Sequence, residues 1–209
     1  MDRATTLTHV DHERAALADQ LRTLHDDDWR TPSLCDGLSV REVLAHLTVS
    51  GAVSPLRWFL GVLRARFDFD RQVDDRLREQ LGADPQETLA RFRATIGSRT
   101  SPPLPAPALL GELVVHGTDI RHPLGLTRDH PHEVLDLLLR YYAGTDQVVV
   151  ARSRVTGLRL EATDTGTTAG EGEVVRGPAL SLIMAMTGRA AACADLTGPG
   201  AAVLAGRCA

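Results

Sequence analysis

Apolar residues recur at helical spacing along most of the first 150 residues, and this periodicity constrains the fold more than any other feature. Between residues 5 and 25, for example, Leu7, Val10, Leu17 and Leu21 lie on one helical face. Prolines, glycines and short polar runs separate the periodic segments. We expect helices over residues 5–25, 40–53, 56–67, 71–81, 84–96, 108–122 and 131–148.

The period changes after Arg152. Leu158 and Leu160 alternate with Arg159 and Glu161, as in a strand that buries one face. We expect further strands over residues 173–176 and 190–196, a Thr/Gly-rich turn over 163–172, and helices over 178–188 and 199–205. The sequence therefore predicts a mainly α protein, with a helical domain over residues 1–150 and a small α+β domain over 153–209.

Composition excludes several classes of function. The net charge is −4 with both signs mixed, so no basic patch for nucleic acid is expected. All 23 basic residues are arginines, which excludes Schiff-base lysines and lysine-dependent phosphate loops. No apolar run approaches the ~20 residues of a membrane span. Three separated cysteines and an N-terminus without an apolar signal core favour a reducing cytoplasm.

The segment around Glu112 and His116 carries the most specific chemical pattern. The two residues are four apart, so on a helix they share one face, and Asp119 follows on the same face. A carboxylate and an imidazole so placed can both reach one divalent cation. The alternative is an exposed Glu–His pair near a helix C-terminus, where a charged histidine is favoured.

His46 is the candidate third ligand. Ser39 and Glu42 form the pattern of a capping box, which predicts that a helix begins at Val40 and carries His46 among apolar neighbours. The alternative is a core histidine that bonds to a backbone carbonyl. The other histidines lie near the N-terminus, at expected helix ends or beside Pro131, and suit a metal site less well.

Two segments together resemble a known family. Residues 29–47, with Trp29, Cys35, the helix-opening Ser-Val-Arg-Glu and His46-Leu47, are similar to the N-terminal signature of the mycothiol-dependent maleylpyruvate isomerase family. Glu112, His116 and Asp119 match its second signature, Glu-x-x-x-His-x-x-Asp. The Thr-Gly-Arg at 187–189 resembles part of the family's C-terminal domain. Leu38 and Thr118 depart from the pattern, where the family usually has tryptophan and often an aromatic residue.

This resemblance implies a DinB-like four-helix bundle in which His46, Glu112 and His116 bind a divalent metal, with zinc as the expected ion. It also implies mycothiol as a thiol cosubstrate and a small electrophilic substrate, without nucleic acid or membrane; a homodimer is left open. The reaction that we expect from the resemblance is cis–trans isomerisation or thiol S-transfer. The competing hypotheses are a non-catalytic metal- or ligand-binding protein of this fold and a structural bundle with a chance triad.

Three further residues are candidates for supporting roles. Asp119 could orient His116 through its other ring nitrogen, act as a fourth ligand, or be a helix-end acid. Arg189 could contact an anionic thiol cofactor or substrate, or be a surface arginine after a helix-ending glycine. We interpret Cys35 as a buried packing cysteine and not as a nucleophile, because no histidine lies near it in sequence.

Overall fold

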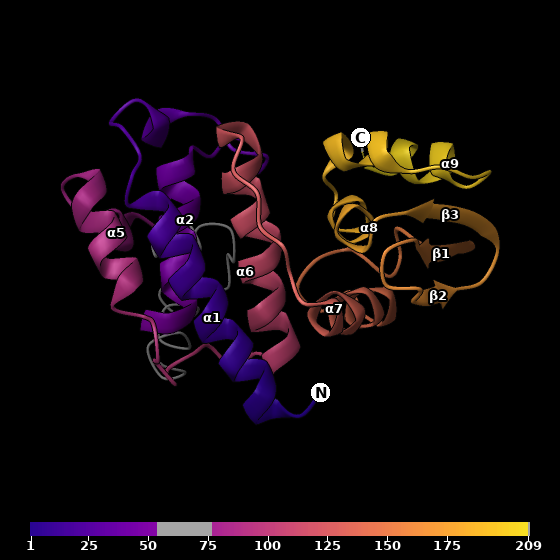
Figure 1. Ribbon diagram of the computed structural model, residues 1–209, viewed down its shortest axis with the longest axis horizontal. Helices are drawn as coiled ribbons and strands as arrows, with labels where there is room; N and C mark the ends of the chain where they lie inside the picture. Colours follow the sequence, from indigo (N-terminus) through magenta and orange to yellow (C-terminus); the bar gives the residue numbers. More distant parts are fainter. Residues whose placement is uncertain (54–76, 209) are drawn as a thin grey trace, which may run out of the picture. The chain divides into compact units, whose positions relative to one another are not determined.

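The computed structural model describes residues 1–53 and 77–208, which divide into two compact units at Thr127 and Arg128 (Figure 1). The expected helix over 56–67 and most of the one over 71–81 lie outside these ranges, although residues 77–81 are helical. No helix within the described ranges is long and apolar enough to cross a membrane.

The N-terminal unit is a helical bundle. Its α-helices are α1 (Arg3–Leu21), α2 (Val40–Ala52), α5 (Pro85–Arg93) and α6 (Ala106–Arg121), with the short 3-10 helices η1 (Asp28–Arg30) and η2 (His122–Leu124). Helix α1 packs against α5 and α6, and α2 packs against the same two helices. These contacts form a closed ring around one apolar core, which confirms the predicted helical class.

Helix α2 begins where the capping box predicts. The Ser39 hydroxyl accepts a hydrogen bond from the backbone N–H of Glu42, and the Glu42 carboxylate accepts one from the Ser39 N–H at 2.8 Å. Val43, Leu44 and Leu47 are fully buried on the face toward the bundle core. Burial of this face fixes the rotation of α2 and therefore the direction in which His46 projects.

The C-terminal unit combines a small sheet with helices. Its elements are α7 (His132–Gly144), β1 (Leu158–Ala162), β2 (Thr168–Gly170), β3 (Glu173–Gly177), α8 (Ala179–Met186), η3 (Ala190–Asp195) and α9 (Ala201–Gly206). The strand order is β2-β1-β3, with β1 antiparallel to β2 and parallel to β3. Helix α8 contacts β1, β3 and α7, and the inward side chains of β1 and β3 are buried against it.

Three details differ from the sequence-based expectation. Helix α7 packs on α8 and β2, so the C-terminal unit begins at Arg128 and not near residue 153. The expected turn over 163–172 contains β2, a strand with no buried side chain and hence no alternating pattern. The expected strand over 190–196 is the 3-10 helix η3, because its alanine-rich sequence lacks the β-branched residues that favour strands.

Candidate metal centre

Helices α2 and α6 bring His46, Glu112 and His116 together. The Nε2 atom of His46 lies 3.2 Å from Oε2 of Glu112, and Nε2 of His116 lies 3.6 Å from the same oxygen. The donor atoms of all three residues lie within 4.8 Å of one another. The two imidazole rings meet nearly edge-on, with their centroids 4.9 Å apart. The predicted triad is therefore one cluster of donor atoms.

Local packing explains how the cluster is held and why it can be reached. Glu112 and His116 share a face of α6 because they are four residues apart, and α2 packs on α6 to bring His46 opposite them. The flanking residues Leu113 and Val115 are buried. The three donor side chains keep 15–25% of their surface exposed, so a small ligand can reach them.

The spacing suits a small divalent ion. For ligand distances of ~2.0–2.2 Å in a tetrahedral zinc site, neighbouring donor atoms lie about 3.4 Å apart. The two separations from the Glu112 oxygen bracket that value. Two imidazoles and one carboxylate are a donor set that zinc accepts, and three protein ligands leave one tetrahedral position for a substrate or water.

Asp119 contacts the opposite nitrogen of His116. Its Oδ2 lies 2.9 Å from His116 Nδ1, and its side chain is fully buried. A carboxylate only accepts hydrogen bonds, so this contact places the proton of a neutral imidazole on Nδ1 and leaves the lone pair on Nε2, toward Glu112. This geometry supports the orienting role among the three alternatives for Asp119.

Cys35 lies closer to the cluster than its sequence position indicates. It is half-buried, not a core residue, and its sulfur lies within 4.8 Å of donor atoms of His116 and Asp119. The interpretation as a buried packing cysteine is therefore corrected. The backbone N–H of Leu34 donates to the carbonyl of Asp119 at 3.2 Å and holds the loop here. The signal that could have indicated this position was its place within the family-like segment 29–47.

Arg189 belongs to the C-terminal unit, whereas the donor cluster belongs to the N-terminal unit. It directly follows the turn that ends α8, and its Nη1 donates a hydrogen bond to the carbonyl of Thr187 at 2.8 Å. Its role toward an anionic thiol or substrate stays a prediction.

Comparisons with known proteins agree with the motifs. Residues 10–100 match the family model described as the mycothiol maleylpyruvate isomerase N-terminal domain, a match that includes Cys35 and His46 but ends before Glu112. Among curated proteins, none matches the chain. Two solved structures have a similar fold, a crystal structure of the mycothiol-dependent maleylpyruvate isomerase and one of its histidine-to-alanine mutant. Each shares 14% sequence identity with a TM-score of 0.63, over 96% of this chain and 94% of the other. The chain thus has the fold of that enzyme, and its residues 10–100 are similar to the N-terminal domain of the mycothiol maleylpyruvate isomerase family.

Proposed function

We propose that this protein is a metal-dependent enzyme that uses a low-molecular-weight thiol, mycothiol, as a nucleophile on a small electrophile. The observation that carries the proposal is the convergence of His46, Glu112 and His116 from two helices at the spacing a tetrahedral ion requires. The family match and the titles of the two similar structures support mycothiol as the thiol.

Each residue of the cluster has a distinct task. His46 and His116 offer neutral nitrogen donors, and Glu112 offers a negative charge that partly balances a divalent ion. Asp119 holds the His116 ring so that Nε2 points toward the donor cluster. A divalent ion bound here would supply Lewis acidity, which lowers the pKa of an incoming thiol and keeps it as the thiolate at neutral pH.

The thiolate could serve two reactions that begin alike. In cis–trans isomerisation the sulfur adds to a conjugated carbon–carbon double bond, rotation follows about the resulting single bond, and the sulfur leaves again. In S-transfer the new carbon–sulfur bond persists and the thiol is consumed. The donor residues serve both reactions equally, so the reaction type depends on the pocket that holds the electrophile.

Metal analysis tests the site. The full chain is stripped with a chelator, reloaded with zinc and analysed by mass spectrometry, beside His46→Ala and the control His12→Ala, which changes an exposed histidine on α1. We expect about one zinc per chain in the wild type and the control, and a large loss in His46→Ala. Absence of zinc from the wild type, or its full retention in His46→Ala, would contradict the proposal.

A thiol assay tests the activity. The zinc-loaded protein is mixed with mycothiol and either maleylpyruvate or a chlorodinitrobenzene electrophile. Conversion of the cis double bond without loss of free thiol indicates isomerisation, whereas loss of one thiol per product indicates transfer. If neither reaction exceeds that of His46→Ala, the chain is a metal-binding protein without this activity, and the enzymatic proposal fails.

A further inference from the structure

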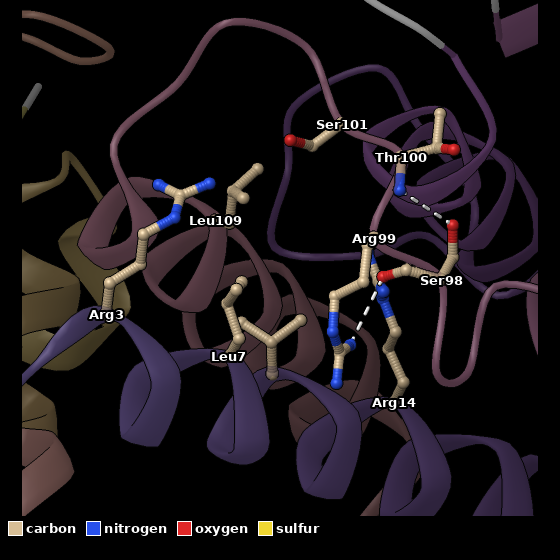
Figure 2. A pocket seen from close by; sticks show the side chains of 9 residues that line it. Arg3, Leu7, Arg14, Ser98, Arg99, Thr100, Ser101 and Leu109 are labelled. Atoms are coloured by element: carbon tan, nitrogen blue, oxygen red, sulfur yellow. Dashed lines mark hydrogen bonds between the residues drawn. The ribbon is translucent and has the colours of Figure 1, made fainter.

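A second polar hollow lies in the N-terminal unit, built from residues other than the metal donors. The N-terminal half of α1, the start of α6 and the loop before α6 enclose a volume of about 260 Å³. Its polar lining consists of Arg3, Arg14, Ser98, Arg99, Thr100 and Ser101. In Figure 2, Arg3 lies on one side and Arg14 and Arg99 on the other, with Leu7 and Leu109 between them.

The hollow carries an excess of positive charge. Three guanidinium groups line it, and no carboxylate does so among the described residues. Asp11 lies close behind: its Oδ2 is 2.8 Å from Arg99 Nη1, and its Oδ1 is 3.9 Å from Arg14 Nη1. Among the residues that the structure describes here, one carboxylate against three arginines leaves two positive charges unbalanced, a potential that attracts anions.

A buried arginine, Arg14, distinguishes this hollow from an ordinary patch of exposed arginines. It is 2% exposed, and its Nη1 donates to the carbonyl of Thr95 at 2.9 Å. Its Nε has no hydrogen-bond partner in the part of the chain that the structure describes. Burial lowers the pKa of this guanidinium, Asp11 opposes that change and Arg99 adds to it. A structural role that links α1 to the segment after α5 explains the bond to Thr95, but it leaves the buried Nε of Arg14 without a partner among the described residues.

Two further details indicate a built site. Gly51 of α2 makes room for the Arg14 guanidinium, since a Cβ at Gly51 would lie 2.8 Å from Arg14 Nη2 and 2.5 Å from the Thr95 Cβ. Arg3 occupies the first turn of α1, where the positive end of the helix dipole disfavours a cation. Placing a positive charge there costs stability, which an anion bound beside it would offset.

The lining matches the chemistry of an oxyanion. Guanidinium groups form paired hydrogen bonds with carboxylate and phosphate, and the hydroxyl groups of Thr100 and Ser101 can add further donors, whereas that of Ser98 donates to the Gly51 carbonyl. Leu7 and Leu109 provide apolar surface for a small carbon skeleton. From this arrangement we infer that the hollow binds a small molecule through a phosphate or carboxylate group. The inference does not depend on the proposed metal chemistry.

Calorimetric titration of the full, chelator-treated chain tests the site without competition from a bound metal. Inorganic phosphate and succinate are the two probes, each compared with chloride at equal ionic strength. We expect millimolar or tighter binding of at least one probe, and the tighter probe identifies the preferred anion. Arg3→Gln should weaken that binding about three- to tenfold, the fold-change expected for loss of one charge-assisted hydrogen bond at an exposed position.

Matched variants separate binding from folding. Arg22→Gln removes an exposed arginine at the other end of α1 and should leave the affinity within twofold of the wild type. Arg3→Gln should retain or raise the thermal midpoint of the anion-free protein, because it removes an unfavourable interaction between a positive charge and the N-terminal end of the helix dipole. Ser101→Ala removes one lining hydroxyl without a change of charge and should also weaken binding. No binding of either probe above chloride, or equal weakening by Arg3→Gln and Arg22→Gln, would overturn the inference.

Discussion

Replacement of Asp119 by asparagine tests the link between the buried carboxylate and the metal centre. The side chain is fully buried, and its Oδ2 lies 2.9 Å from His116 Nδ1. Asparagine has nearly the same shape, so the substitution removes the negative charge while the amide oxygen can still accept a hydrogen bond. The bond to His116 then changes from charge-assisted to neutral.

The magnitude follows from that change. A hydrogen bond to a charged group contributes about 1.5–3 kcal/mol, and a neutral one about 0.5–1.5 kcal/mol. The difference of about 1–1.5 kcal/mol corresponds to roughly tenfold weaker metal binding. The loss grows if the asparagine NH₂ turns toward Nδ1, because the imidazole proton must then move to Nε2 and block the metal donor. Loss of an outer-shell partner typically costs about 10- to 100-fold in metal affinity, which agrees with this range.

The assay is a competition for zinc between the full chain and a chromophoric chelator. Asp19→Asn, which neutralises an exposed aspartate on α1, is the matched control and should retain wild-type affinity. The thermal midpoint of the metal-free protein is measured in parallel to show that Asp119→Asn remains folded. Wild-type zinc affinity in a folded Asp119→Asn variant would refute the orienting role.

Three other predictions have defined outcomes. Cys35→Ser should leave zinc stoichiometry unchanged, because this sulfur groups with His116 and the buried carboxylate and not with the three-residue donor cluster; loss of zinc would contradict that. Gly51→Ala should destabilise the protein by about 1–3 kcal/mol in urea unfolding, because its Cβ would lie 2.5 Å from the Thr95 Cβ. Gly144→Ala, with nothing within 4 Å, is its near-neutral control. Burial, reinforced by the neighbouring thiol of Cys193, raises the pKa of Cys208 from 9.0 to about 11. The unfolded thiol ionises first, so stability should fall as pH rises from about 9 to 11, and Cys208→Ser should reduce that fall.

Local signals predicted most of the fold. The capping box located the first residue of α2, and the alternation of Leu158 and Leu160 with charged residues located β1. Strand β2 was not predicted from the sequence, because its pairing depends on a close approach of two backbone segments. Gly170 has φ +76°, and a Cβ there would lie 2.4 Å from the Leu158 carbonyl oxygen. The boundary between the two units was expected about 25 residues too late, because the periodicity of α7 does not specify which elements its buried face packs against.

Only part of the candidate site could be predicted from local sequence patterns. The four-residue spacing of Glu112 and His116 predicts a shared helical face, but nothing in the spacing connects His46 to them. That connection arises from the packing of α2 on α6, a tertiary contact. The family resemblance supplied it at the sequence level, whereas the proximity of Cys35 to His116 needed the structure because the loop before α2 has no periodic pattern.

The loop before α2, residues 31–39, contacts both helices that carry the candidate metal donors. Trp29 is buried just before it, and the Val40 N–H donates to the Thr31 carbonyl at 2.9 Å. The Leu34 N–H reaches the carbonyl of Asp119, whose side chain holds His116. The loop is therefore bonded to the beginning of α2, which carries His46, and to the end of α6, which carries the carboxylate that contacts His116. Changes in this loop should consequently alter metal affinity through the separation of the two helices, even where they leave all three donors intact.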